Sequence, residues 1–164
     1  MRLSWTLFLL IGLLPACNKE SAEPALLFDK SHGCKQFDLK STGEDGHGQD
    51  CLYYTYSDKE LKIKHVNAGF NCCPEGFVVN LKVSGDTLVI IERENSNLCD
   101  CNCLFDLEYT LTGISKDKWW VLVDEEYVHG EMEPMLFQVD LRKEPEGKWC
   151  VERTRYPWRE FIDN

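Results

Sequence analysis

The sequence has no apolar run long enough to cross a membrane as a helix. Its N-terminal apolar stretch extends only from Leu3 to Leu14, whereas a spanning helix needs about 20 such residues. Beyond residue 30, no window shows sustained apolar residues at helical spacing, and no internal repeat or low-complexity run occurs. These absences argue against a spanning helix, a helical domain and a repeat architecture.

The sequence is also poor in basic residues. Lysine and arginine number 18 against 28 aspartates and glutamates, which gives a formal net charge of -10. Proteins that bind nucleic acids need basic surfaces to displace the counterions of the phosphate backbone. Nucleic acid is therefore excluded as an expected partner.

Recognisable catalytic motifs are absent. The chain has no H-E-x-x-H, no G-x-S-x-G, no C-x-x-C and no phosphate-binding glycine loop. Its four histidines are scattered, at positions 32, 47, 65 and 129. The chain is not predicted to be an enzyme, and no cofactor is expected. Its 164 residues, of which 43% are hydrophobic and 12% aromatic, suit one globular domain.

The N-terminus has the layout of an export signal. The short positive region Met1-Arg2 precedes the apolar stretch, and the motif Leu14-Pro15-Ala16-Cys17 ends it. An apolar segment of about 7 to 15 residues is typical of a cleavable signal peptide. Residues 1–16 are therefore predicted to be a signal peptide.

The motif Leu14-Pro15-Ala16-Cys17 resembles the lipobox of bacterial lipoproteins, which has an apolar residue at -3, a small residue at -1 and an obligatory cysteine. It departs from the commonest pattern at Pro15, where alanine or serine is more usual. The resemblance implies that Cys17 receives a diacylglycerol and that the signal is cleaved before it. Asn18, in place of an aspartate, implies an outer-membrane destination by the enterobacterial sorting rule.

The predicted domain boundaries follow from this leader. Residues 17–30 are predicted to be a lipidated tether, because the segment from Asn18 to about Leu27 is polar at first, contains Pro24 and has no periodicity. Residues 31–164 are predicted to form a single β domain. The alternative is an ordinary signal peptide cleaved after Ala16, with Cys17 the first of nine bridging cysteines.

Alternation of apolar and polar residues predicts strands through the body of the chain. The clearest run covers residues 99–111, where the odd positions are all apolar and five of the six even positions are polar. The predicted strands cover residues 51–56, 61–67, 77–83, 87–93, 105–111, 119–123, 136–141 and 149–154. Ser84-Gly85-Asp86 is typical of a β-hairpin turn. Connections too short for crossover helices indicate antiparallel neighbours.

The predicted fold is all-β, an antiparallel β-sandwich or open barrel of about eight strands stapled by disulfides. Nine cysteines in so short a chain point to an oxidising compartment, in which disulfides persist. If Cys17 carries lipid, an even number remains. The eight disulfide candidates are Cys34, Cys51, Cys72, Cys73, Cys99, Cys101, Cys103 and Cys150.

Two groups of these cysteines are expected to meet at one corner. Cys72-Cys73 precedes the strand 77–83, and the Cys99/Cys101/Cys103 trio leads into the strand 105–111. If these two strands flank 87–93 in a meander, they run parallel, and at least one bridge between the pair and the trio is predicted. Cys34 with Cys51 is the preferred second pair, and Cys150 is expected to bond to a remaining member of the corner, although eight cysteines allow 105 connectivities.

A metal or thiol-redox site in this corner is the alternative interpretation. Alternating cysteines chelate soft ions such as Cu(I) or Zn(II), and His65 could complete such a site. Paired zinc knuckles are absent, and an oxidising compartment favours disulfides. The cysteines also alternate in phase with core residues instead of lying on an exposed low-pKa turn. No metal is predicted.

Two further groups each have a functional and a plainer interpretation. Five acids occupy residues 124–133: Asp124, Glu125, Glu126, Glu131 and Glu133. They could bind calcium, but the EF-hand spacing is missing, and ion pairs with Arg153, Arg155 and Arg159 are preferred. Trp119 and Trp120 must point to opposite faces of a strand. One belongs in the core, and the other packs under a loop or forms an exposed platform for a sugar or a protein.

These observations predict a lipid-anchored cell-envelope protein that serves as a non-catalytic binding or structural module. Its expected partners are the membrane, through the anchor, and a protein or glycan ligand. The alternative is an envelope metal-binding or thiol-redox protein that uses the cysteine corner. The body of the chain also resembles small, cysteine-rich, all-β lipoproteins of uncharacterised function from diderm bacteria, a resemblance that implies no activity.

Overall fold

The computed structural model describes residues 23–35, 48–95, 99–128 and 130–153. Within these ranges the chain forms nine β-strands and no helix, which confirms the predicted all-β fold. The strands are β1 (Ala25–His32), β2 (Gln49–Ser57), β3 (Glu60–Asn71), β4 (Phe77–Ser84), β5 (Thr87–Glu94), β6 (Asn102–Thr112), β7 (Lys118–Asp124), β8 (Met135–Asp140) and β9 (Glu146–Glu152). No helix capable of crossing a membrane is found in the described ranges.

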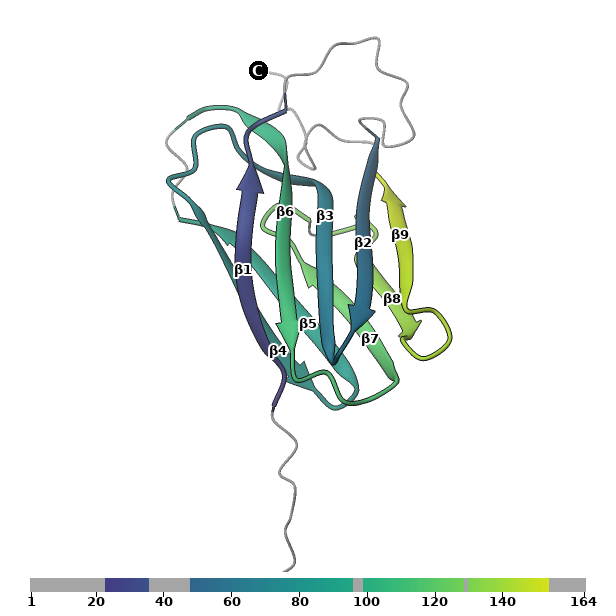
Figure 1. Cartoon of the computed structure of the whole chain (residues 1–164). Helices are drawn as coiled ribbons and strands as arrows, with labels where there is room; N and C mark the ends of the chain where they lie inside the picture. The colour runs from purple at the N-terminus through teal and green to yellow at the C-terminus, as the bar shows by residue number, and fades with distance from the viewer. Residues whose placement is uncertain (1–22, 36–47, 96–98, 129, 154–164) are drawn as a thin grey trace, which may run out of the picture.

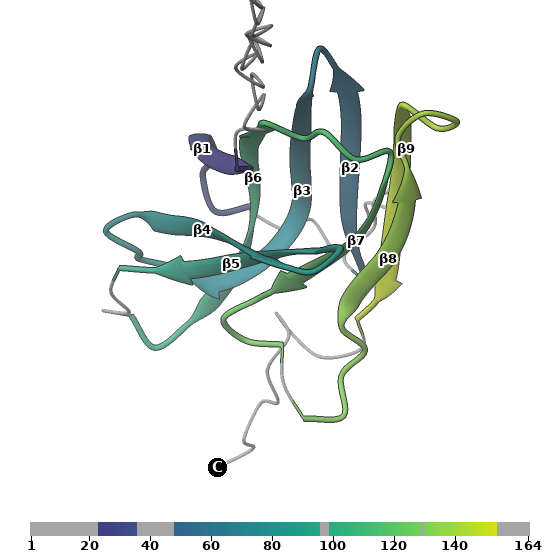
Figure 2. The same cartoon turned by 90° about the horizontal axis from the view of Figure 1, so that it is seen from below.

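The strands are arranged in two sheets. Sheet A has five strands in the order β1-β6-β3-β2-β9, and sheet B has four in the order β4-β5-β7-β8. The two sheets pack face to face and are not closed into a barrel, so the sandwich alternative of the prediction is confirmed (Figure 1, Figure 2).

The two hairpins have the turn chemistry that tight loops require. Gly85 has φ of 66° in the predicted β4–β5 hairpin, where Ser84 pairs with Thr87. In the β2–β3 hairpin, Asp58 and Lys59 have φ of 52° and 66°. A positive φ at the central residues matches the right-handed twist of the flanking strands. Both turns lie at the same end of the sandwich, next to residues 114–116 (Figure 1).

The core lies between the sheets and follows the alternation in the sequence. The inward side chains of β6 are Cys103, Phe105, Leu107, Tyr109 and Leu111, all at most 4% exposed. They face sheet B, whose inward side chains include Leu88, Ile90 and Val121. Burial of each large apolar side chain stabilises the fold by about 1.5 to 3 kcal/mol. The regular strand begins at Asn102, so the predicted alternation from residue 99 started three residues too early.

A bulge in β3 keeps both halves of that strand facing the core. The register between β3 and β6 shifts between Val66 and Ala68, and Asn67 has φ of 71°. Asparagine tolerates this left-handed conformation better than most residues. The extra residue changes which positions face inward, from Ile63 and His65 before the bulge to Ala68 and Phe70 after it.

The predicted meander is wrong. β6 leaves the sheet of β4 and β5 and lies in sheet A between β1 and β3, whereas β5 pairs with β7. The short connection 57–59 joins an antiparallel pair as expected, but 115–117 joins β6 to β7 of the other sheet, so these two neighbours do not pair. The β5–β7 pair is parallel, so sheet B is not antiparallel throughout. Strand alternation shows which side chains face a core. It does not show the sheet, because a strand with one apolar face can bury that face from either sheet of a sandwich. The choice of sheet therefore depends on contacts distant in sequence.

The predicted tether is too long. β1 covers residues 25–32, which were assigned partly to the tether, and it pairs antiparallel with β6 from Ala25–Thr112 to His32–Asp106. The segment shows no period-two alternation because most of its side chains are exposed on both faces. Its order comes from backbone pairing to the edge of sheet A.

Candidate functional site

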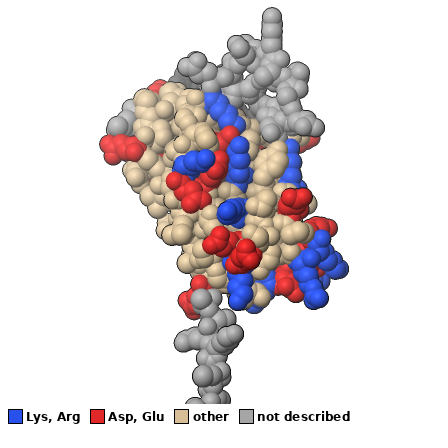
Figure 3. All heavy atoms as spheres, viewed as in Figure 1, with Lys and Arg blue, Asp and Glu red and all other residues tan. Residues whose placement is uncertain are grey.

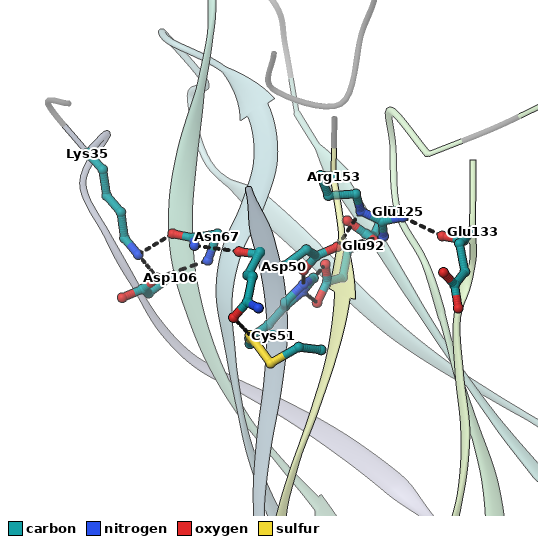
Figure 4. Close-up of polar contacts among 12 residues, drawn as sticks. Lys35, Asp50, Cys51, Asn67, Glu92, Asp106, Glu125, Glu133 and Arg153 are labelled. Carbon is teal, nitrogen blue, oxygen red and sulfur yellow. Dashed lines mark hydrogen bonds and ion pairs between the residues drawn. A yellow bond between two sulfur atoms is a disulfide. The ribbon is translucent and has the colours of Figure 1, made fainter. Parts of the chain in front are cut away.

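Five ionisable side chains meet in the interior between the two sheets. They are Asp50, His65, Glu92, Glu125 and Arg153, and none is more than 6% exposed. Asp50, His65 and Glu92 occupy inward-facing positions of their strands. Glu125 and Arg153 continue the same alternation just past the ends of β7 and β9. We refer to these five residues as the buried charge cluster (Figure 4). Burial of so many charges is costly unless each is paired.

His65 of β3 joins the two sheets through carboxylates on both of its ring nitrogens. Its Nε2 lies 2.5 Å from Asp50 Oδ1 on the neighbouring strand β2. Its Nδ1 lies 3.0 and 2.9 Å from the two oxygens of Glu92 on β5 of sheet B. Both nitrogens of a protonated imidazole donate, so this geometry fits a positively charged His65.

Arg153, which follows β9, makes the second set of ion pairs. Its Nε and Nη2 donate to Asp50 Oδ2 at 2.9 and 2.6 Å, and Nη2 also donates to Glu125 Oε1 at 2.7 Å. Its Nη1 donates to the backbone carbonyl of Glu133 in the loop before β8. These contacts attach the end of sheet A to the β7–β8 loop of sheet B (Figure 4).

Two further buried oxygens, the Tyr109 hydroxyl and Glu125 Oε2, affect the charge balance of the cluster. The Tyr109 hydroxyl donates to Glu92 Oε1 at 3.0 Å, and burial, together with the charge of Glu92, raises the pKa of Tyr109 well above its ordinary value. Glu125 Oε2 is buried and has no hydrogen-bond partner among the described residues. An unpaired ionised oxygen is expensive in such a place, which favours a protonated Glu125.

The pKa shifts agree with a cluster whose net charge is zero. Burial alone lowers the pKa of His65, but the charges of Glu92 and Asp50 outweigh it and raise that pKa well above the ordinary value. Burial and then the charge of Asp50 raise the pKa of Glu125 well above its ordinary value. With His65 charged and Glu125 neutral, two positive charges balance the two negative charges of Asp50 and Glu92.

We expect the stability of the protein to fall as the solution becomes alkaline. Because the folded pKa of His65 is raised, its contribution is present below the unfolded value of 6.5 and is lost as the pH rises through the folded pKa. Glu125 acts in the same direction from its unfolded value of 4.5 upward. Urea denaturation between about pH 5 and pH 9 should show a falling free energy of unfolding, by up to about 1.4 kcal/mol per pH unit for each group.

A matched variant tests the origin of this pH dependence. Glu125→Gln mimics the protonated carboxyl, so it should retain stability at pH 6 and lose part of the slope. The exposed acid Glu131 provides the control, since Glu131→Gln should leave the slope unchanged. Stability that rises with pH, or equal slopes for all three proteins, would show that the cluster is not protonated as described.

The cluster also contains the described residues best placed to hold a metal ion. Asp50, His65 and Glu125 each offer a ligand atom, and these atoms lie within 4.8 Å of one another. However, the guanidinium of Arg153 already donates to both carboxylates, at 2.6 and 2.7 Å. A cation therefore lies against both acids. We interpret the cluster as a buried ion-pair network instead of a metal centre.

The eight cysteines of the described chain form four disulfides. They are Cys34–Cys103, Cys51–Cys150, Cys72–Cys101 and Cys73–Cys99. The predicted bridge between the pair and the trio is confirmed twice over. The cause differs from the prediction: the end of β3 lies beside the start of β6, where Asn71 pairs with Asn102.

The preferred partners of the other cysteines are wrong. Cys34 bonds to Cys103 instead of Cys51, and Cys51 bonds to Cys150 because β9 pairs with β2 and places these two residues opposite each other. The hypothesis of a thiolate metal site finds no free thiolate among the described cysteines. His65, proposed to complete such a site, has Asp50 and Glu92 as its partners.

Comparison with known proteins finds no relative. No protein-family model, no curated protein and no solved structure matches the chain. The interpretation of the site therefore depends on its own geometry.

For the acidic segment 124–133, the plainer interpretation is a solvated connection that pairs with Arg153, and only the pairing is confirmed for Glu125, which is 4% exposed. Glu125 pairs with Arg153, as expected for that arginine. Asp124 and Glu126 lie 2.8 and 3.6 Å from Arg93 of β5. Arg155 and Arg159 lie outside the described residues, as do His47 and His129.

The adjacent tryptophans divide between the core and the surface. Trp119 is 3% exposed, whereas Trp120 is 39% exposed on the outer face of sheet B. The preferred interpretation, in which the second tryptophan packs under a loop, does not account for this exposure of Trp120. Cys17, the predicted lipidation site, lies outside the described residues.

Sequence reasoning missed the buried charge cluster, although a signal for it exists. Asp50 continues the inward positions of Leu52 and Tyr54, and Glu92 continues those of Leu88 and Ile90. A polar residue at an apolar position of an alternating strand marks a buried partner. What the alternation cannot show is which of these residues meet.

Proposed function

We propose that the protein is a lipid-anchored component of the bacterial cell envelope that serves as a non-catalytic binding or structural module. The observation that carries this proposal is the pairing of all eight described cysteines. Eight of the nine cysteines form four disulfides, so the one that remains is Cys17, at the lipobox-like motif. Four disulfides also fit an exported protein, because cytosolic thiols are kept reduced.

The position of β1 supports a short tether. Eight residue steps separate Cys17 from Ala25, the first residue of β1, and they span at most about 28 Å when fully extended. Ala25 pairs with Thr112 at the end of β6, whereas the cysteine corner lies at the start of β6. The anchored end and the cysteine corner are therefore at opposite ends of sheet A (Figure 1).

The burial of the described groups with strongly shifted pKa values supports a non-catalytic role. A catalytic side chain must touch its substrate. The described groups whose pKa is strongly shifted are His65, Tyr109 and Glu125, and all three are at most 4% exposed. Their burial favours a structural function for the cluster.

Palmitate labelling tests the anchor. Expressed in a diderm bacterium, the wild-type chain should incorporate labelled palmitate and yield a mature product that begins at residue 17. Cys17→Ala should lose the label, because no other cysteine is available for acylation. Pro15→Ala, which brings the motif closer to the common lipobox, should keep it. An unlabelled wild-type product, or equal labelling of Cys17→Ala, would refute the anchor.

A further inference from the structure

The outer face of sheet A carries a groove of about 630 Å³ that extends across its strands. Two acids on the edge strands of sheet A line it, Asp29 of β1 and Glu146 of β9. Between them, its outward side chains come from Tyr53, Thr55, Lys62, Lys64, Glu108 and Thr110. These residues alternate with buried residues of β2, β3 and β6, so they point away from the core. In the strand register they form two adjacent rows, which makes the groove one continuous surface.

Two acids of the groove already have partners. Glu108 lies 3.1 Å from Lys30 and 3.1 Å from His32. The hydrogen bond from His32 is the main cause of the lowered pKa of Glu108. Asp29 accepts a hydrogen bond from the Thr110 hydroxyl at 2.9 Å. Repulsion of a bound anion by these two acids is therefore reduced.

The two lysines of β3 are much less engaged. Within the described part of the chain, the side chain of Lys62 has no ion pair or hydrogen bond. Lys64 has 47% of its side chain exposed and reaches Asp106 only at 4.0 Å, whereas Asp106 is held by Lys35 at 2.5 Å. Figure 3 shows lysine and arginine side chains over this face, interspersed with aspartate and glutamate side chains. The groove thus offers two available cations in a protein of net charge -10.

The other side chains of the groove suit a hydroxyl-rich ligand. A protein partner is usually anchored by aromatic or aliphatic side chains in apolar pockets. Among the described residues that line the groove, Tyr53 is the outward aromatic ring, and Lys148 Nζ lies 4.8 Å from its centroid. The side chains of Thr55 and Glu146 have no hydrogen-bond partner in the described ranges. Sugar hydroxyls both donate and accept, so they can satisfy a hydroxyl and a carboxylate together.

We propose that this groove binds an acidic polysaccharide whose sugar units carry carboxylates. The carboxylates of the ligand pair with Lys62 and Lys64, and its hydroxyls bond to Thr55 and Glu146. The inference rests on the proposed binding function, but it does not depend on acylation of Cys17.

Calorimetric titration of the mature, detergent-solubilised protein tests the proposal. The probes are hexagalacturonate, the neutral maltohexaose and hexa-aspartate, which has acidic groups but no sugar. Hexagalacturonate should bind at least about tenfold more tightly than either other probe, and Lys62→Glu with Lys64→Glu should weaken it by about tenfold or more. The control is Lys82→Glu with Lys118→Glu on exposed positions of sheet B, which should leave the affinity unchanged.

Each contrary result overturns a definite part of the proposal. Equal binding of hexa-aspartate shows attraction by charge alone. An equal loss in the control pair places the site elsewhere, and absence of hexagalacturonate binding removes the ligand class. Unfolding temperatures of both variant pairs, compared with wild type, separate loss of binding from loss of fold. Palmitate labelling is measured independently, so failure of the groove and failure of the anchor are distinguishable.

Discussion

Replacement of Arg153 by methionine is expected to lower the free energy of unfolding by about 3 to 5 kcal/mol. The side chain of Arg153 is 2% exposed and donates to Asp50 and Glu125. Its removal leaves Asp50 as a buried charge whose other partner is His65, while methionine keeps most of the apolar volume. Urea denaturation at neutral pH measures the loss.

Arg142→Met is the matched control for this substitution. Arg142 is exposed and has no ion pair or hydrogen bond in the described part of the chain, so its replacement should change stability by less than about 0.5 kcal/mol. Adding Asp50→Asn to Arg153→Met should cost less than the sum of the single changes, because the two residues interact directly. If the stability costs of Asp50→Asn and Arg153→Met are additive, the two residues do not interact. If Arg153→Met and Arg142→Met cost the same, Arg153 is not part of a buried ion-pair network.

Loss of the Cys51–Cys150 disulfide is expected to cost about 4 kcal/mol. This bridge joins residues 99 positions apart and ties the edge strand β9 to β2. A disulfide stabilises mainly by restricting the unfolded chain, and the restriction grows with the loop it closes. The Cys72–Cys101 bridge lies within that loop and shortens it. The expected stability cost is therefore slightly below the value for an unbridged loop of 99 residues. Urea denaturation of Cys51→Ala with Cys150→Ala tests the value.

The Cys73–Cys99 bridge provides the contrast. Cys72 and Cys101 lie beside it in the sequence and form their own bridge, so the second bridge closes only a very small additional loop. Cys73→Ala with Cys99→Ala should therefore cost less than half as much as loss of Cys51–Cys150. If the two losses are equal, loop closure is not the source of the stabilisation, and local packing must be considered instead.

Eight of the nine strands were predicted because their side chains alternate. In β6, for example, Phe105, Leu107 and Tyr109 are apolar while Asp106 and Glu108 are polar, and one sheet face is buried. β1 escaped prediction for the opposite reason. Leu27 is 60% exposed and Leu26 only partly buried, so the segment has no buried face to mark it.

The candidate sites were predicted less well than the strands. The pairing of Arg153 with the acidic loop was expected, but Asp50, Glu92 and the role of His65 were not. Their partners are 15 to 103 residues away in sequence, and such contacts arise only when β2, β3, β5 and β9 are placed together. The groove on sheet A likewise exists because β3 lies between β2 and β6.

The sequence by itself determined the all-β class, the positions of most strands and the β4–β5 hairpin turn. These features depend on side-chain periodicity and turn chemistry, which act over a few neighbouring residues. The tertiary structure alone decided which sheet contains β6, which cysteines face each other across β2 and β9, and which inward polar residues neutralise one another. Such choices depend on the summed energy of many distant contacts, and no single stretch of the chain contains that information.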